Sequence, residues 1–289
     1  MARGHVLEVA VGTGRNLEYY DWEDIKEMAS ATQGEQQTEH ERERKRKRLE
    51  KLESGKWKRD DVSPELLSFT GVDISTDVLE VSWGKLRKAV PELISKRRRQ
   101  RAEAQGQDKG QSKTSSLPTA EGNTLAVNLG DGRIRLFKGD AQASLPAPPS
   151  SDGSASSPTK YDTIVQTFGL CSVAEPSRLL SEMAGALQPN TGRIILLEHG
   201  RGWYDFINSM LDKYAPSHFQ RFGCWWNRDI EGIVRAAADT IPGLEVVRVE
   251  RPYVLQAGTM LWVELQLVRP GAEGGNGSKV PRSAPAESR

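Results

Sequence analysis

The stretch Val6–Asn16, "VLEVAVGTGRN", decides the fold class. A short apolar run holds one acid, Glu8, and ends in two glycines one residue apart, Gly12 and Gly14. A buried strand followed by a glycine-rich turn is the typical start of a Rossmann-like α/β sheet, in which the turn lies against a nucleotide-like ligand. A dinucleotide site needs a third glycine three residues after the second, and Leu17 stands there.

Counting from Ala10 removes the need for that third glycine, since the stretch then reads E-x-A-x-G-x-G. This pattern is typical of sites for S-adenosylmethionine (SAM). SAM has no pyrophosphate, so the turn must leave room for the amino-acid end of the ligand. The glycines let the backbone approach closely, and Glu8 can accept a hydrogen bond from a ligand ammonium or from water.

The acid that binds the ribose hydroxyls usually follows the glycines by about 20 residues, at the end of the second strand. Here Asp73 ends the strand-like stretch 66–75, about sixty residues on, because the charged stretch 21–66 is an insertion. Asp140 ends the strand-like stretch 133–142 and can accept from an adenine amino group. The predicted cofactor-binding residues are Glu8, Ala10, Gly12, Gly14, Asn16, Asp73, Ile74, Asp140, Ala141, Gln166 and Thr167.

Strand-like and helix-like stretches alternate along the 289 residues, which predicts an α/β fold with a doubly wound parallel sheet. The closing stretches 244–255 and 259–268 predict an antiparallel edge hairpin. We expect one domain over residues 1–270, low-complexity insertions at about 21–66, 96–130 and 145–160, and a disordered tail over 271–289. The net charge of +1 favours no class of partner, two cysteines are too few for a disulfide framework, and no apolar run is long enough to span a membrane.

Several motifs together carry a family resemblance. "LEVAVGTGRNLEYY", "GVDIS" and "GDAQ" resemble the class I SAM-dependent methyltransferases, in the branch of quinone-biosynthesis and phospholipid methyltransferases. The stretch 168–229, with "FGLCSVAEPSRLL" and "GCWWNRDI", is similar to the animal thiol S-methyltransferases and most similar to fungal mitochondrial inner-membrane methyltransferase-like proteins.

The resemblance implies a seven-stranded Rossmann-like sheet with a reversed edge strand, SAM as cofactor, and association with the mitochondrial inner membrane. Ala10 stands where the family usually has glycine, a change small enough to keep the turn. The helices and anchor that the family carries before its first strand do not precede Val6, so we expect a trimmed start or a longer form of the protein.

Few residues suggest catalysis, because methyl transfer from an activated sulfonium mainly needs positioning, exclusion of water and removal of a proton. His199, in "LEHGRG", is the candidate general base. The alternative is a histidine that hydrogen-bonds its own loop. Cys171 is interpreted as a small buried thiol, and no spacing in the sequence indicates a metal site.

The segment 202–226 is rich in aromatic residues. It can form a lid over an apolar acceptor or a face that touches a membrane surface, and it can equally be aromatic packing that holds a helical excursion on the sheet. The basic insertions lack interleaved aromatic residues, so no specific nucleic-acid partner is expected.

Together these observations predict a SAM-dependent methyltransferase that acts on a small, hydrophobic acceptor, whether quinone-like, lipid or thiol. The alternative is a non-catalytic methyltransferase-like assembly factor at the mitochondrial inner membrane. An RNA methyltransferase is disfavoured, because "QTFGLCS" stands where an Asn-Pro-Pro-Tyr type catalytic loop would follow the fourth strand.

Overall fold

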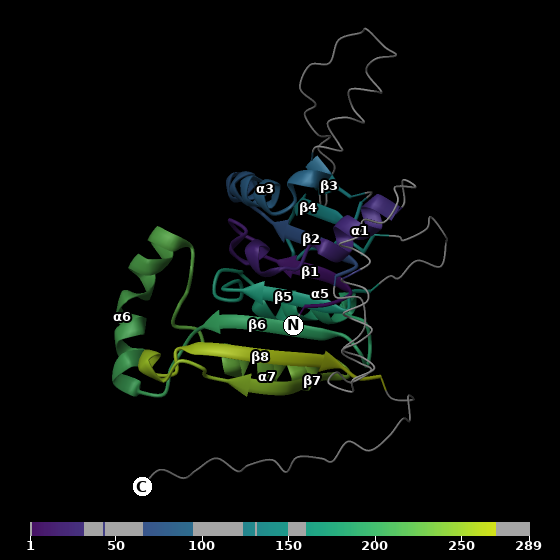
Figure 1. Ribbon diagram of the computed structural model, residues 1–289. Helices are drawn as coiled ribbons and strands as arrows, with labels where there is room; N and C mark the ends of the chain where they lie inside the picture. The colour runs from purple at the N-terminus through teal and green to yellow at the C-terminus, as the bar shows by residue number, and fades with distance from the viewer. Residues whose placement is uncertain are drawn as a thin grey trace.

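The protein is described here from a computed structural model, which covers residues 2–31, 43, 66–94, 124–130, 132–149 and 160–269. Its centre is one mixed sheet in the order β3-β4-β2-β1-β5-β6-β8-β7 (Figure 1). The strands are β1 (His5–Val9), β2 (Ser68–Asp73), β3 (Thr124–Leu129), β4 (Ile134–Lys138), β5 (Thr163–Thr167), β6 (Arg193–His199), β7 (Leu244–Glu250) and β8 (Met260–Leu267).

The five strands β4, β2, β1, β5 and β6 run parallel, and antiparallel pairs close both edges of the sheet. The chain winds outward from β1 through β2 to β4, and then returns to the other side of β1 with β5 and β6. The topological switch point therefore lies between β1 and β5, where ligands bind in open α/β sheets.

Helices cover both faces of the sheet, which produces two hydrophobic cores. On one face α5 (Pro176–Ala186) and α7 (Ile230–Thr240) pack against β1, β5, β6 and β8. On the other face lie the 3₁₀ helix η1 (Arg15–Tyr19), α1 (Glu23–Ala31) and α3 (Thr76–Ala89). All five residues of β1 are buried, as expected for a central parallel strand covered on both sides.

A longer helix, α6 (Asp205–Phe222), stands apart at the end of the sheet to which β5 and β6 point (Figure 1). Only Asn208 and Ala215 of its eighteen residues are buried. The short 3₁₀ helix η3 (Val254–Gln256) lies in the connection between β7 and β8. No helix in the described part of the chain is long and apolar enough to cross a membrane.

The predicted fold class is confirmed, including the closing antiparallel hairpin, which is β7 with β8. The sheet has eight strands, one more than the seven that the family resemblance implied. The additional strand is β3, which pairs antiparallel with β4 and lies inside the range 96–130 that the sequence assigned to an insertion.

The first predicted insertion also contains ordered structure. Helix α1 occupies residues that were assigned to the stretch 21–66, and Trp22 and Ile25 belong to the core beneath it. The apolar face of α1 is short and lies among charged residues, so the sequence pattern did not indicate a helix here. Most of the three predicted insertions and the whole tail 271–289 lie outside the described residues.

Candidate functional site

The glycine turn links the end of β1 to η1 at the switch point. Ala10, Gly12 and Gly14 all have positive φ, at 55°, 55° and 69°. The Gly14 N–H donates to the carbonyl of Val11 over 2.9 Å, and the Val11 N–H donates to the carbonyl of Val72 over 3.1 Å, so the turn is held against the end of β2. Alternating left-handed residues fold the chain tightly here, which explains the glycine spacing.

The two glycines differ in the space around them. A Cβ on Gly14 would lie 2.5 Å from Leu17 Cδ1 and 2.8 Å from Ser82 Oγ, so Gly14 allows close packing of the turn on η1 and α3. A Cβ on Gly12 would have no neighbour nearer than the Ala10 carbonyl oxygen at 3.8 Å. The open side of Gly12 is thus the part of the turn that a ligand can approach.

Asp73 is the last residue of β2 and lies directly beside that open turn. Its Oδ2 accepts from the Gly12 N–H over 2.8 Å, and its Oδ1 accepts from the Ser75 N–H over 2.9 Å. The sequence separated Asp73 from the glycines by about sixty residues, and parallel pairing of β1 with β2 brings them together. The neighbouring Ile74 side chain is 65% exposed, which leaves an apolar surface next to the carboxylate.

Asp140 lies in the loop that follows β4, the strand next to β2. The Gly139 N–H donates to the Asp73 carbonyl over 2.9 Å, so the loop that carries Asp140 and Ala141 begins beside Asp73. Asp140 is exposed and its Oδ1 accepts from the backbone N–H of Gln142 over 2.9 Å. Both acids therefore stand at the carboxyl ends of adjacent parallel strands, as their order in the sequence predicted.

Glu8 is 1% exposed, and both its carboxylate oxygens have donors within the protein. Asn16 Nδ2 donates to its Oε1 over 3.0 Å, and the Tyr20 hydroxyl donates to its Oε2 over 2.9 Å. Asn16 Nδ2 also lies 3.1 Å from Thr167 Oγ1 at the end of β5. This arrangement joins β1, η1 and β5 across the switch point, and it assigns Glu8 a role in holding Asn16 and Tyr20 in place.

Burial dominates the electrostatics of Glu8. It raises the pKa of this carboxyl from its ordinary 4.5 to about 7, against the opposing effect of the hydrogen bonds from Tyr20 and Asn16. A buried carboxyl group is costly to ionise because its carboxylate form loses hydration, and a nearby positive charge from a ligand would offset that cost. The predicted contact between Glu8 and a ligand ammonium stays a prediction.

Gln166 is fully buried on the opposite face of the sheet from Glu8, next to Ile164 in the core beneath α5. Neither polar atom of its amide has a hydrogen-bond partner among the described residues. The amide lies against Gly169, where an added Cβ would collide with Gln166 Nε2. Of the two predicted residues at the end of β5, Thr167 faces the Glu8 side of the sheet, and Gln166 does not.

The candidate base His199 is the last residue of β6, at the same edge of the sheet. Its Nε2 lies 2.8 Å from Cys224 Sγ, and the ring of Phe168 lies 5.2 Å from its own ring. Burial acts to lower the pKa of His199, but Cys171 and the carboxylate of Glu198 outweigh burial, and the pKa is raised. The role of His199 as a general base stays a prediction.

Cys224 was not singled out by the sequence, because its partners come from other segments. The donor atoms of Cys171, His199 and Cys224 all lie within 4.8 Å of one another. Spacing along the chain carries no signal for this cluster, since the three residues follow β5, end β6 and follow α6. A pair of cysteines and one histidine at strand and helix ends was the only sequence clue.

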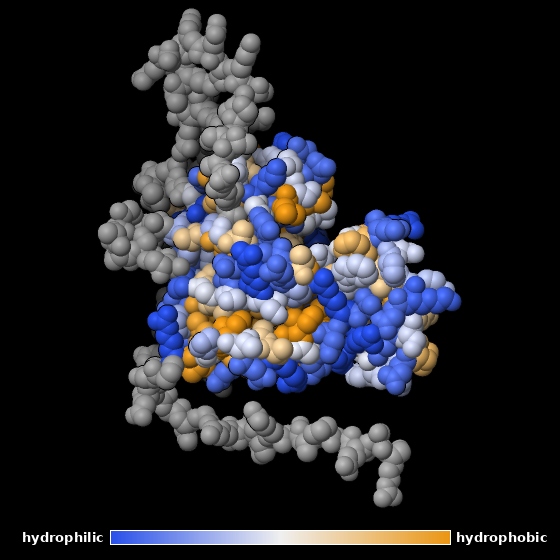
Figure 2. All heavy atoms as spheres, turned by 180° about the vertical axis from the view of Figure 1, so that it is seen from behind, coloured by the Kyte–Doolittle hydropathy of each residue, from blue (hydrophilic) through white to orange (hydrophobic). Residues whose placement is uncertain are grey.

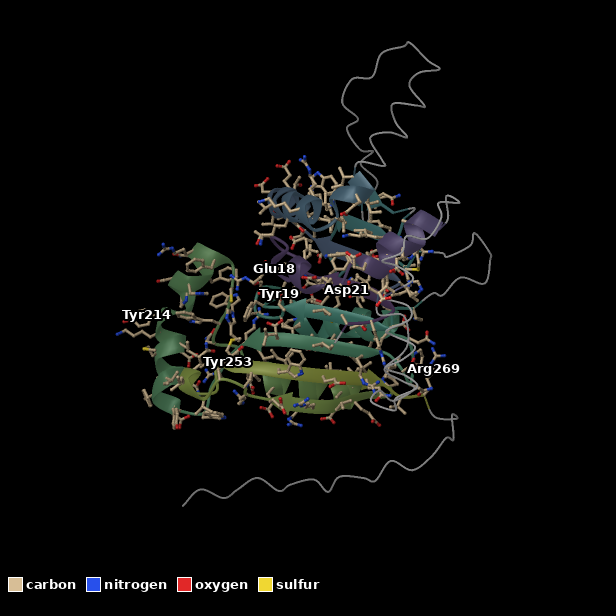
Figure 3. The ribbon with its side chains drawn as sticks, viewed as in Figure 1. Glu18, Tyr19, Asp21, Tyr214, Tyr253 and Arg269 are labelled. Atoms are coloured by element: carbon tan, nitrogen blue, oxygen red, sulfur yellow. The ribbon has the colours of Figure 1, made fainter. Side chains whose placement is uncertain are left out.

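The aromatic segment 202–226 contains both packed and exposed rings. Phe219 stacks on Trp225 with centroids 4.4 Å apart, and His218 stacks on Trp226 at 3.9 Å. On α6, however, Phe206 is 73% exposed, and Figure 3 shows Tyr214 on the side of α6 away from the sheet. Seen from behind, the α6 region projects from the body and mixes hydrophilic with apolar side chains (Figure 2). The stacked rings therefore support aromatic packing of this segment, and the exposed rings support a lid or a face that touches a membrane surface.

No protein-family model matches the chain. Over 228 residues, 79% of its length, it is 30% identical to the mitochondrial methyltransferase OMS1 of Saccharomyces cerevisiae. The chain is a homologue of a methyltransferase. The predicted resemblance is confirmed by this similarity, and the chain spans about a third (32%) of the length of that relative.

Solved structures resemble the chain more weakly. YcgJ of Bacillus subtilis has a TM-score of 0.45 at 11% identity, covering 93% of this chain and 94% of YcgJ. A SAM-dependent methyltransferase of Mesorhizobium loti has a TM-score of 0.43 at 13% identity, covering 91% of each chain.

Proposed function

We propose that the chain is a SAM-dependent methyltransferase. The observation that carries the proposal is the open side of Gly12 directly beside the Asp73 carboxylate, at the switch point of a doubly wound sheet. A side chain at Gly12 would occupy this space, and the acid next to it is the acceptor that a ribose requires. The homology to a mitochondrial methyltransferase supports the same reaction class.

The residues present fit SAM. Asp73 would accept from the ribose hydroxyls, Asp140 from the adenine amino group, and the exposed Ile74 would cover the adenine ring beside Ala141. At the other end of the site, Glu8 with Asn16 and Thr167 would hold the amino-acid portion of the ligand. When bound, SAM supplies a methyl group on a positively charged sulfur, which needs no further activation.

The chain's own contribution is then to position the acceptor and exclude water. His199, at the end of β6, is the proposed group that takes the proton from an acceptor hydroxyl, thiol or carbon acid. The half-exposed imidazole lies at the sheet edge that also carries the glycine turn, which supports this role.

We infer a small, hydrophobic acceptor, whether quinone-like, lipid or thiol, from the exposed aromatic side chains of 202–226 at the carboxyl end of the sheet. The same side chains support contact between this segment and a membrane surface. We propose a location at the mitochondrial inner membrane on the family resemblance, and the mitochondrial relative supports the mitochondrial part of that proposal. The mixed surface of α6 in Figure 2 favours transient contact over deep insertion.

Calorimetric titration with SAM and with its demethylated product tests the proposal. The wild type should bind both, and Asp73→Ala should bind at least about a hundredfold more weakly, since hydrogen bonds to a charged acceptor contribute about 1.5–3 kcal/mol each. Asp77→Ala is the matched control, because Asp77 is an exposed acid in the first turn of α3. Failure of the folded wild type to bind either ligand would refute the enzyme proposal and favour the assembly-factor alternative.

The acceptor is tested with radiolabelled SAM and mitochondrial extracts separated into lipid, small-molecule and RNA fractions. We expect label in the lipid or small-molecule fraction, and loss of that label in Asp73→Ala. Label that enters only RNA would contradict the proposed acceptor class.

A further inference from the structure

Both cysteines of the chain lie in one cluster with a histidine. The whole sequence contains two cysteines, Cys171 and Cys224, and their sulfur atoms lie within 4.8 Å of each other and of the His199 ring nitrogen. Cys171 is fully buried, Cys224 is 6% exposed and His199 is half-buried. Two thiols and an imidazole thus converge from the loop after β5, the end of β6 and the end of α6.

We propose that Cys171, His199 and Cys224 bind a zinc ion, with a fourth coordination position left for water or a small ligand. Thiolate and imidazole are the ligands that Zn²⁺ prefers, and two cysteines with one histidine form a recognised three-ligand zinc set. Hard cations such as Mg²⁺ and Ca²⁺ require oxygen ligands, which this cluster does not supply.

The geometry is close to what a tetrahedral ion requires. With zinc–sulfur distances near 2.3 Å and zinc–nitrogen distances near 2.0–2.1 Å, donor atoms should lie about 3.6–3.8 Å apart. The observed His199 Nε2 to Cys224 Sγ distance of 2.8 Å must open by roughly 1 Å, and the remaining separations stay below 4.8 Å. Side-chain rotation on fixed backbone segments covers shifts of this size.

The backbone around the cluster is held in place by contacts that do not use the donor atoms. The Trp225 N–H donates to the Cys171 carbonyl over 2.9 Å, and His218 Nδ1 lies 2.9 Å from the Cys224 carbonyl oxygen. Arg228 Nη1 donates to the carbonyls of Leu170 and Val173 over 2.6 and 2.7 Å. These contacts hold the backbone on both sides of Cys171 and at Cys224.

Charge also favours a divalent ion in the cluster. Two thiolates and a neutral imidazole carry two negative charges, which Zn²⁺ neutralises. The ion would join three segments and fasten the carboxyl end of α6, a helix otherwise almost entirely exposed, to the sheet. In the zinc-bound protein His199 coordinates the ion through its ring nitrogen and does not serve as a base.

Metal analysis of the untagged full chain tests the proposal directly. We expect about one zinc per chain after purification, and a cobalt-substituted protein with thiolate charge-transfer and tetrahedral absorption bands. Cys171→Ser, Cys224→Ser and His199→Gln should each lower zinc affinity at least tenfold. His5→Gln is the matched control, because it changes a histidine at the start of β1, away from the cluster, where His5 Nδ1 lies 2.8 Å from Ser68 Oγ.

A second measurement on the unmodified chain covers the case in which a cysteine variant fails to fold. Zinc should slow the reaction of both cysteines with a thiol reagent at least tenfold, and a chelator should restore it. Chelation should also speed amide hydrogen exchange over 201–228 and leave α7 unchanged. Three outcomes would each overturn the proposal. The wild type could retain no zinc and give no cobalt bands, the cobalt bands could persist in both cysteine variants, or a disulfide between the cysteines could form freely in the presence of zinc.

Parallel SAM titrations keep this inference separate from the proposed SAM binding, because the zinc site uses no residue that would contact SAM. It does take His199, so zinc coordination and the proposed role of His199 as a base exclude each other. Zinc binding without SAM binding would support the metal site and refute the enzyme proposal. SAM binding by a chain that holds no zinc and gives no cobalt bands would support the enzyme proposal and refute the metal site.

Discussion

Replacement of Glu8 by Gln should stabilise the protein at alkaline pH and leave it nearly unchanged at acidic pH. Glu8 is almost completely buried in the middle of the sheet, where it accepts from Asn16 and Tyr20. Glutamine has the same shape and keeps an oxygen for Asn16, and the Tyr20 hydroxyl can rotate to accept from the new amide. The substitution therefore mainly removes an ionisable group from a site that disfavours charge.

The magnitude follows from the pKa of Glu8. Burial raises this pKa from 4.5 to about 7. Between these values the folded protein holds a proton that the unfolded chain releases, so the contribution of Glu8 to the free energy of unfolding falls as the pH rises. At about 1.4 kcal/mol per pKa unit, the wild type loses about 3 kcal/mol through ionisation of Glu8 between pH 4.5 and pH 7.5. The glutamine variant does not lose it.

Urea denaturation of both proteins at pH 5, 6, 7 and 8 measures the difference. Glu8→Gln should lie within about 1 kcal/mol of the wild type at pH 5 and exceed it by about 2–3 kcal/mol at pH 8. Glu18→Gln, at an exposed position in η1 (Figure 3), should show no such trend. A difference between Glu8→Gln and the wild type that stays constant with pH would refute the assignment of Glu8 as a carboxyl disfavoured by burial.

Three substitutions at glycine-related positions test the local geometry. Gly14→Ala should lower the free energy of unfolding, measured in denaturant, by at least about 2 kcal/mol, because its Cβ meets Leu17 and Ser82 and its φ is positive. A variant as stable as the wild type would contradict this packing. Gly12→Ala should lower the free energy of unfolding by only about 1–2 kcal/mol but lower SAM affinity at least tenfold, since its open side is the proposed ligand side. An unchanged SAM affinity in calorimetry would exclude a ligand on that side of Gly12. Ala10→Gly should raise the free energy of unfolding by up to about 1 kcal/mol, seen as a slightly higher midpoint of thermal unfolding, because Ala10 has a φ of 55°. A lowered midpoint would speak against strain at this turn.

The sequence predicted those parts of the site that local pattern and strand order control. Glycine spacing after a buried strand located the turn, and acids at strand ends located Asp73 and Asp140, since carboxyl ends of parallel strands meet at one edge. The stretch at 124–129 carried a weaker signal. Its alternation is short, it buries only Val127 and Leu129, and it directly follows a low-complexity stretch, although the glycines at 130 and 132 mark a hairpin turn.

The tertiary structure alone determined those features of the site that depend on contacts between distant segments. The sequence marked Glu8 as a ligand residue, but only the fold shows that Asn16 and Tyr20 occupy both its oxygens and that burial raises its pKa. Likewise Cys171, His199 and Cys224 have no shared spacing and converge only because β5 and β6 end side by side and α6 returns to that edge. Patterns within a strand or turn arise from local backbone geometry, so a sequence can display them, whereas burial and side-chain convergence exist only after the sheet has formed.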